Sequence, residues 1–370
     1  MKTLFIFILS FLFFACNEQQ KTTEIPVHAT TNQKTTAAKG KAAIAGQQIS
    51  AYIREIYRDK KGNLWLGTND DGVARYNGTT LEYFSVEQGL SGYQVTGITE
   101  DKKGNVWMST TNGISKFDGN AFTNYTINDG LGTNTVWTVF VDSKNMVWAG
   151  TPNGVYRYSQ VHTSENGNVK AFQLFTIPKS IHVKAPETMI SAEQVWCFTE
   201  DKDGNIWIGT DGYGVVIYNP KAAKGDPNTF KHITENDGIC DNCITGILFD
   251  NNNQVWFSSF FGGVSIYDYK TFTTFNSVNG IGDNECGSLF MDKAGNIWFA
   301  SEGFGVYKYG SLLNDKQSLI NYSQKHGLEV SAVQAIYQDK KGRMWCGGGG
   351  GLFRMDEDHF VHIKTNGPWD

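Results

Sequence analysis

The sequence predicts an all-β fold, a seven-bladed β-propeller with four antiparallel strands in each blade. The first observation is a motif of the form Asp-x-x-Gly-Asn-x-Trp, which recurs at Trp65, Trp107, Trp148, Trp207, Trp256, Trp298 and Trp345. The second is that four strand signals fall within each repeat of about 42 residues. The third is composition, because 14% of the residues are aromatic and 41 are glycine, which suits strands and tight turns. Short strands repeated in this way fit a closed ring better than a solenoid.

The net charge of the chain limits the kinds of partner that can be expected to bind it. Charged residues make up 19% of the chain and the formal net charge is -5, so no basic surface is expected to attract nucleic acid. The same composition excludes a disordered chain, a coiled coil and a collagen-like chain.

The first fifteen residues have the pattern of an export signal. A positively charged start precedes an apolar run that ends at Phe14, and the small Ala15 stands before Cys16. This junction resembles the lipobox of bacterial lipoproteins, in which the cysteine becomes the lipidated N-terminus, although Phe13 stands where that motif prefers Leu. We predict a lipoprotein signal peptide over residues 1–15 and lipidation of Cys16. The alternative is an ordinary secreted protein with an incidental cysteine.

Residues 16–45 are predicted to form a flexible tether between the lipid and the folded domain. They are rich in Lys, Thr, Gln and Ala and hold few large apolar groups, so they cannot bury enough surface to become ordered. No later stretch approaches ~18 consecutive apolar residues, so the lipid is the only expected membrane attachment. The prediction is therefore an exported lipoprotein of the outer membrane or periplasm, or of the cell surface.

The propeller is expected over residues 46–370, and the second repeat illustrates the order of its strands. Val95 starts the inner strand, and the turn at 101–105 leads into a second strand that carries the Trp and small residues. Gly113 opens the third strand, and the large apolar pair Phe122 and Tyr125 marks the fourth. All seven repeats are complete, so the ring is expected to close without strand exchange. The segment Glu24–His28 is a candidate for an additional edge strand.

The repeats resemble a known family. Glu100–Trp107, followed by Gly113–Asp118, is similar to the two-component regulator propeller repeat, and the resemblance extends over residues 47–365. It implies an extracytoplasmic sensor domain, which in that family often precedes a membrane helix and a histidine kinase. This chain has one ring and neither of those parts, so ligand recognition without a kinase of its own is expected. The repeats resemble more weakly those of the streptogramin lyase propeller, which uses a metal ion with His and Glu.

A candidate binding face follows from the repeat register. Loops that enter the first strand and loops between the second and third strands share one face of a propeller. Trp137 and Trp196 have the same register there in adjacent blades, and aromatic rings beside amides and carboxylates suit a sugar or similar polar ligand. The alternative is that these side chains pack the channel or form a solvated rim. The predicted ligand-binding residues are Arg54, Tyr93, Trp137, Glu193, Trp196, Tyr213, Asn242, Phe260, Phe261 and Glu285.

Two cysteines in one loop form the candidate disulfide. Cys240 and Cys243 are three positions apart, and an exported compartment favours their pairing. Free buried thiols are the first alternative, and a metal site that adds Cys286 is the second.

The function predicted from the sequence is binding rather than catalysis. We expect an exported, lipid-anchored, sensor-like propeller that binds a small polar ligand such as a carbohydrate, or a membrane-associated protein partner. No cofactor and no metal are predicted, because the histidines fall mainly in insertions and outer strands, away from the candidate face. The alternatives are a protein-interaction scaffold at the outer membrane and a metal-dependent enzyme similar to streptogramin lyase.

Overall fold

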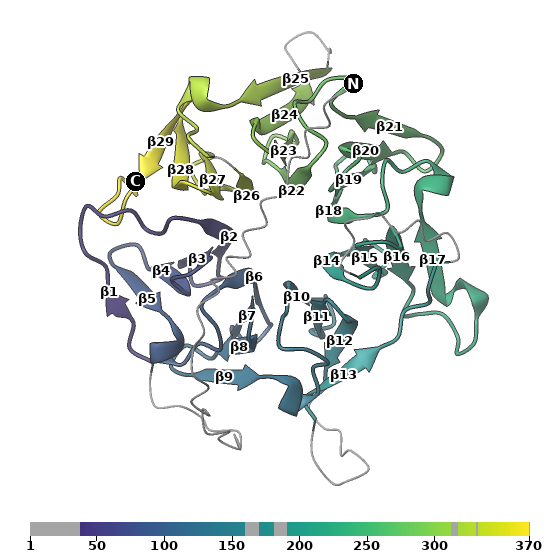
Figure 1. Ribbon diagram of the computed structural model, residues 1–370, viewed down its shortest axis with the longest axis horizontal. Helices are drawn as coiled ribbons and strands as arrows, with labels where there is room; N and C mark the ends of the chain where they lie inside the picture. Colours follow the sequence, from purple (N-terminus) through teal and green to yellow (C-terminus); the bar gives the residue numbers. More distant parts are fainter. Residues whose placement is uncertain (1–37, 160–169, 181–190, 312–316, 331, 370) are drawn as a thin grey trace, which may run out of the picture. The chain divides into compact units, whose positions relative to one another are not determined.

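A computed structural model describes residues 38–159, 170–180, 191–311, 317–330 and 332–369. The predicted seven-bladed β-propeller is confirmed, with four antiparallel strands in each blade and inner strands that surround the axis of the ring (Figure 1). The predicted signal peptide, Cys16 and Glu24–His28 lie outside the described residues. Within them, no helix is long and apolar enough to cross a membrane.

Blades are numbered in chain order, and each blade runs from an inner to an outer strand. The inner strands are β2 (Ile53–Arg58), β6 (Val95–Glu100), β10 (Thr138–Val141), β14 (Val195–Glu200), β18 (Ile244–Phe249), β22 (Cys286–Met291) and β26 (Val333–Gln338). The second strands are β3 (Leu64–Thr68), β7 (Val106–Thr110), β11 (Val147–Thr151), β15 (Ile206–Thr210), β19 (Val255–Ser259), β23 (Ile297–Ser301) and β27 (Met344–Gly348). Each inner strand packs against the inner strands of both neighbouring blades, so blade 7 contacts blade 1 and the ring is closed.

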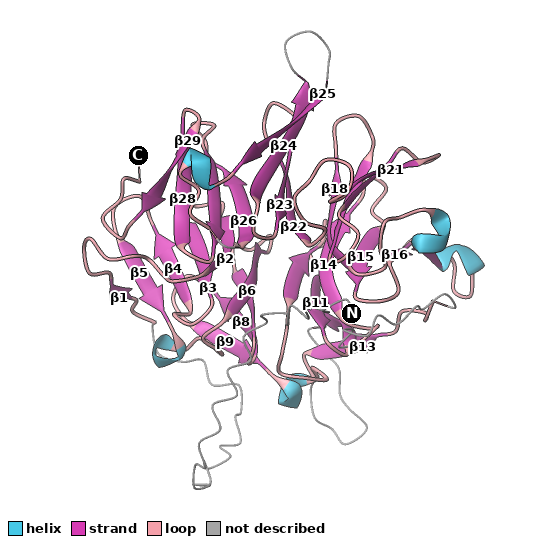
Figure 2. Ribbon diagram, turned by 45° about the horizontal axis from the view of Figure 1, so that its top comes forward, coloured by secondary structure: helices cyan, strands magenta, loops and turns pink. Residues whose placement is uncertain are grey.

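The outer half of each blade completes the sheet. The third strands are β4 (Val73–Tyr76), β8 (Gly113–Phe117), β12 (Gly154–Tyr158), β16 (Val215–Tyr218), β20 (Val264–Tyr267), β24 (Gly305–Ser311) and β28 (Gly351–Asp356). The fourth strands are β5 (Leu81–Phe84), β9 (Phe122–Tyr125), β13 (Phe172–Phe175), β17 (Phe230–Ile233), β21 (Phe272–Phe275), β25 (Gln317–Tyr322) and β29 (His359–Ile363). The helices of the described chain are short 3-10 turns at the blade edges (Figure 2), namely η1 (Val86–Gln88), η2 (Ile127–Asp129), η3 (Pro227–Thr229), η4 (Glu235–Asp237) and η5 (Gln324–His326).

The repeated Asp and Trp of the motif are joined by a hydrogen bond in every blade. In blade 2, Asp101 Oδ2 accepts from Trp107 Nε1 (3.0 Å) and Asn105 Nδ2 (2.7 Å), while Oδ1 accepts from the backbone N–H of Lys103 and Asn105 (both 2.9 Å). Burial raises the pKa of Asp101, but these hydrogen bonds outweigh it and leave the pKa below its usual value. The same Asp–Trp bond measures 2.9 to 3.1 Å in the seven blades. The motif recurs because one carboxylate both closes the turn and orients the indole.

The turn glycine of the motif has a left-handed conformation, which glycine adopts without strain. Gly104 has a φ of 81°. The two copies that lack this glycine place Asn145 (φ 69°) and Asn253 (φ 63°) in the same region, which Asn tolerates better than most residues. The turn geometry is thus preserved where the motif is degenerate.

The core lies between the blades. Trp65 of blade 1 is buried in one cluster with Val95, Ile98 and Met108 of blade 2. The small residue two positions after each Trp allows this approach, because a Cβ atom added to Gly67 would lie 2.9 Å from the carbonyl oxygen of Val95. Aromatic packing between neighbouring blades therefore accounts for most of the repeated aromatic residues.

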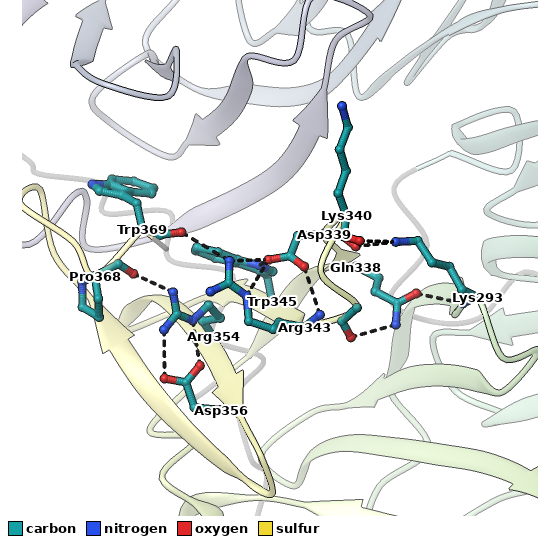
Figure 3. A network of polar contacts seen from close by, with 11 residues as sticks. Lys293, Gln338, Asp339, Lys340, Arg343, Trp345, Arg354, Asp356, Pro368 and Trp369 are labelled. Atoms are coloured by element: carbon teal, nitrogen blue, oxygen red, sulfur yellow. Dashed lines mark hydrogen bonds and ion pairs between the residues drawn. The ribbon is translucent and has the colours of Figure 1, made fainter.

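The two ends of the described chain meet where blade 1 adjoins blade 7. β1 (Lys41–Ala42) adds an edge strand to β5, inside the segment that the sequence assigned to the tether, and Thr365 Oγ1 donates to the carbonyl of Ile44 (2.6 Å). The ring of Trp369 stacks on Tyr76 of blade 1, with centroids 4.2 Å apart. Arg354 of blade 7 donates to the carbonyl of Pro368 (2.9 Å), as Figure 3 shows. Ring closure proceeds without strand exchange, since every blade takes its inner and outer strands from one repeat.

Candidate functional site

The predicted face carries two groups of side chains of different chemistry. We call Trp137, Trp196, Phe260 and Phe261, from blades 3 to 5, the aromatic arc. We call Tyr52, Arg54, Glu285 and Glu302, from blades 1 and 6, the charged arc. The residues of both arcs lie at or beside the ends of the inner and second strands of their blades.

The aromatic arc is a run of neighbouring rings. The centroids of Trp137 and Trp196 are 5.7 Å apart with a tilt of 38°, and Phe260 follows Trp196 at 6.1 Å and 32°. Phe261 follows Phe260 at 5.3 Å and is 40% exposed. The structure therefore brings together four of the five aromatic residues that the sequence singled out in blades 3 to 5, while the fifth, Tyr213, is buried in the core cluster around Trp148. Both tryptophans are half-buried.

Asp211, which the sequence analysis missed, holds the centre of the aromatic arc. Its Oδ1 atom accepts from Trp196 Nε1 (3.1 Å) and from Cys243 Sγ (2.9 Å). Asp211 is buried in the loop after β15. Burial, together with the charge of Asp211, raises the pKa of the Cys243 thiol, which keeps it protonated as a donor. The Asp211 carboxylate thus holds the indole of Trp196 in place, and its bond to Cys243 links blade 4 to blade 5.

Cys240 and Cys243 are free thiols, so the predicted disulfide is not formed in the structure. The side chains use different partners, because Cys243 bonds to Asp211 of blade 4 while Cys240 Sγ lies 3.4 Å from Ser259 Oγ of blade 5. Cys243 is buried and Cys240 is half-buried. Among the described residues, no group of three His, Cys, Asp or Glu side chains is placed to hold a metal ion.

Glu193, Tyr213 and Asn242 lie on the predicted face but are engaged by the fold. Glu193 Oε1 pairs with Lys179 Nζ at 2.8 Å and is also hydrogen-bonded to Tyr213. Burial and the neighbouring Glu193 raise the pKa of Tyr213. Asn242 Oδ1 accepts from the backbone N–H of Glu235 (3.0 Å). These three residues position the loops around the aromatic arc, and Lys179 neutralises the one carboxylate among them.

The charged arc begins with an arginine held in place by amides. Arg54 Nε donates to Asn69 Oδ1 (2.8 Å), the guanidinium lies 5.2 Å above the ring of Tyr52, and the Gln94 amide contacts both Arg54 and Asn69. Burial lowers the pKa of Arg54, and Tyr52 and Asp70 oppose that shift. The predicted Arg54 is therefore a cation held in place by Asn69, Gln94 and the ring of Tyr52.

Carboxylates of blade 6 complete the charged arc. Burial, the charge of Glu302 and the charge of Asp283 raise the pKa of Glu285 to about 7. Burial and Asp283 likewise raise the pKa of Glu302. Burial raises the pKa of Tyr52. The charge of Arg54 opposes this shift, and the charges of Glu302 and Glu285 add to it, so charged groups of blades 1 and 6 interact. The predicted Glu285 is thus a half-buried group that titrates near neutral pH.

Tyr93 lies apart from both arcs. Its side chain is 52% exposed and lines a cavity of about 350 Å³ between blades 1 and 2, with Asn69, Gln94 and Asn112. Tyr93 lies on the predicted face, but the structure does not bring it into contact with the aromatic arc.

A protein-family model matches four of the seven repeats. The two-component regulator propeller repeat matches residues 47–70, 89–112, 189–212 and 327–350, which contribute to blades 1, 2, 4 and 7. The chain therefore carries repeats of this family, as the sequence predicted. A comparison with curated protein sequences finds no match.

Solved structures share the fold at low sequence identity. A streptogramin B lyase has a TM-score of 0.60 at 11% identity, over 86% of this chain and 96% of that chain. PorZ, a surface component of the type-IX secretion system of Porphyromonas gingivalis, has a TM-score of 0.59 at 17% identity, over 84% of this chain and 47% of that chain. The extracellular domain of the hybrid two-component system BT3049 of B. thetaiotaomicron has a TM-score of 0.45 at 18% identity, over 83% of this chain and 52% of that chain. The chain spans about half the length of the last two proteins, and identities this low establish the fold alone.

Proposed function

We propose that this protein, a propeller built from two-component regulator repeats, is an exported sensor-like module that binds a small neutral polar ligand, a sugar in particular, on its aromatic arc. The observation that carries the proposal is the run of half-buried rings from Trp137 through Trp196 to Phe260, with centroids 5.7 and 6.1 Å apart. Blade packing does not require the two tryptophans, because the equivalent residues in the other blades are Arg54, Thr96, Thr245, Gly287 and Gln334.

The chemistry of the aromatic arc suits the C–H face of a sugar ring. Indole and phenyl rings supply flat apolar area at little conformational cost, and hydrogen-bonding groups beside them give orientation. The nearest ion pair, Lys179 with Glu193 at 2.8 Å, neutralises itself, which favours an uncharged ligand. The predicted signal peptide and Cys16 support an exported lipoprotein at the membrane, which would pass the signal to a separate membrane-associated partner.

The test is a binding screen of the full chain on an array of neutral and acidic oligosaccharides, followed by titration of the tightest-binding saccharide. The double variant Trp137→Ala/Trp196→Ala should bind it about 100-fold more weakly, since it loses two stacked rings. Tyr93→Ala is the matched control, an exposed aromatic residue of the same face outside the aromatic arc, and should bind like the wild type. Equal affinity of the double variant and the wild type would contradict the assignment.

A second candidate function is docking to a protein at the cell surface. Two exposed aromatic residues of the same face favour it, Tyr93 at 52% and Phe304 at 47% exposure. PorZ, which shares the fold, is a surface component of a secretion system. Co-purification of a membrane protein that is lost in Tyr93→Ala/Phe304→Ala but kept in Trp137→Ala/Trp196→Ala would favour this candidate. Turnover of a streptogramin that a chelator abolishes would instead support the lyase alternative.

A further inference from the structure

Three register positions lie at each junction between neighbouring blades on this face. The first follows the aliphatic residue that begins the inner-strand register (Ile53, Val136 or Val195), the second follows the end of the second strand of that blade, and the third precedes the inner-strand register of the next blade. At the junction of blades 1 and 2 they are Arg54, Asn69 and Gln94. The amide oxygen of Asn69 accepts from Arg54 Nε (2.8 Å), and the Gln94 amide contacts both residues.

The junction of blades 4 and 5 uses the same arrangement with different side chains. Trp196, Asp211 and Cys243 occupy the three positions, and Asp211 Oδ1 accepts from the other two at 3.1 and 2.9 Å. In both junctions the middle residue supplies an oxygen that pairs the groups on either side. In these two junctions the first and third residues therefore contact one common acceptor.

The junction of blades 3 and 4 lacks that acceptor. Its three residues are Trp137, Pro152 and Gln194, and the middle residue is a proline, which has neither a side-chain oxygen nor a backbone N–H. Trp137 Nε1 and both polar atoms of Gln194 are buried, and none has a hydrogen-bond partner among the residues that the structure describes. The Gln194 side chain is 0% exposed. Buried polar groups are nearly always paired, so this cluster requires a partner from outside the fold.

We infer that the junction of blades 3 and 4 is a subsite that hydrogen-bonds one hydroxyl group of the ligand, an inference that rests on the proposed function. A hydroxyl oxygen accepts from Trp137 Nε1 and Gln194 Nε2, and its hydrogen is donated to Gln194 Oε1. A carboxylate would leave Oε1 opposite another acceptor, and an ammonium group would leave the two N–H donors unpaired. The subsite adjoins the rings of the aromatic arc, so it binds a hydroxyl at the edge of a sugar that stacks on Trp196.

Substitution of Pro152 tests the subsite in the full-length protein. Pro152→Asn supplies the amide oxygen that Asn69 supplies between blades 1 and 2, so it should occupy the place of the ligand hydroxyl. Pro152→Ala is the matched control, because it restores the backbone N–H without a side-chain acceptor. Relative to Pro152→Ala, we expect Pro152→Asn to melt about 2 °C higher and to bind the array-selected saccharide about tenfold more weakly.

Deoxy analogues of the same saccharide identify the hydroxyl. One monodeoxy analogue should bind the wild type about tenfold more weakly than the parent sugar. Gln194→Leu, which replaces an unpaired amide by an apolar group of similar shape, should remain folded and bind the parent and that analogue equally. Wild-type affinity for the parent sugar in both Pro152→Asn and Gln194→Leu would mean that only an ordered water fills the junction. That result would overturn the inference and leave the proposed function standing, whereas a wild type that binds no saccharide of the array overturns both.

Discussion

The aromatic arc and the charged arc lie on the same face of the ring and differ in the partners that their buried polar groups have. In the aromatic arc, one buried carboxylate, Asp211, accepts from Trp196 and Cys243, at 3.1 and 2.9 Å. In the charged arc, the pKa of Glu285 is raised to about 7 by burial and by neighbouring carboxylates. The strand register is the same in both, so the difference lies in a few side chains at the blade junctions. One scaffold thus carries a run of rings held by a carboxylate beside a group of carboxylates whose pKa values are raised.

The largest expected effect comes from removing Asp211. Asp211→Ala should destabilise the protein by about 2–4 kcal/mol, because Trp196 Nε1 and the Cys243 thiol lose their shared acceptor inside the fold. Asp211→Asn keeps an oxygen at the same place and is the matched control, with a loss of about 1 kcal/mol. Urea unfolding followed by circular dichroism measures both.

The equivalent change in the charged arc sharpens the comparison. Asn69→Ala should cost only about 1 kcal/mol, because Arg54 is half-buried and retains contact with Gln94 and water. If Asn69→Ala and Asp211→Ala were equally destabilising, the two arcs would not differ in the way the burial of their polar groups indicates.

The contrast between scaffold and site also explains what the sequence could predict. The fold was predictable because each repeat carries the same Asp and Trp, and the Asp–Trp bond of 2.9 to 3.1 Å requires both in every blade. Trp137 and Trp196 were identified because they depart from the repeat at one register position. Asp211 and Gln194 were missed, since a single Asp or Gln in a loop carries no signal until the register shows which residues of two blades meet.

The pH dependence of the charged arc is the second largest expected effect. The pKa of Glu285 is raised to about 7 in the fold from the ordinary value of 4.5, mainly by burial. The Glu285 carboxyl group then binds its proton more tightly in the folded state than in the unfolded state. Its contribution to the free energy of unfolding therefore falls as pH rises from 4.5 to 7 and is constant above pH 7. Glu285→Gln should therefore be more stable than the wild type by about 1–2 kcal/mol at pH 8 and no more stable at pH 4.

Urea midpoints of the wild type and Glu285→Gln at the two pH values test this expectation. Ligand binding on the aromatic arc should show no such dependence, because its four rings carry no titratable group. A gain in stability of the same size at pH 4 and pH 8 would attribute the effect of the substitution to packing rather than to the charge.

The smallest expected effect concerns the thiols beside Asp211. Cys243→Ala should cost about 0.5–1 kcal/mol and Cys243→Ser almost nothing, because the hydroxyl keeps the bond to Asp211. In the native protein at pH 8, Cys243 should resist alkylation by iodoacetamide, since burial and the charge of Asp211 raise its pKa. After unfolding in guanidinium without reductant, both Cys240 and Cys243 should be alkylated and each should add the mass of one label. A Cys240–Cys243 disulfide would instead leave both unlabelled until a reductant is added, and it would remove the thiol that links blade 5 to the aromatic arc.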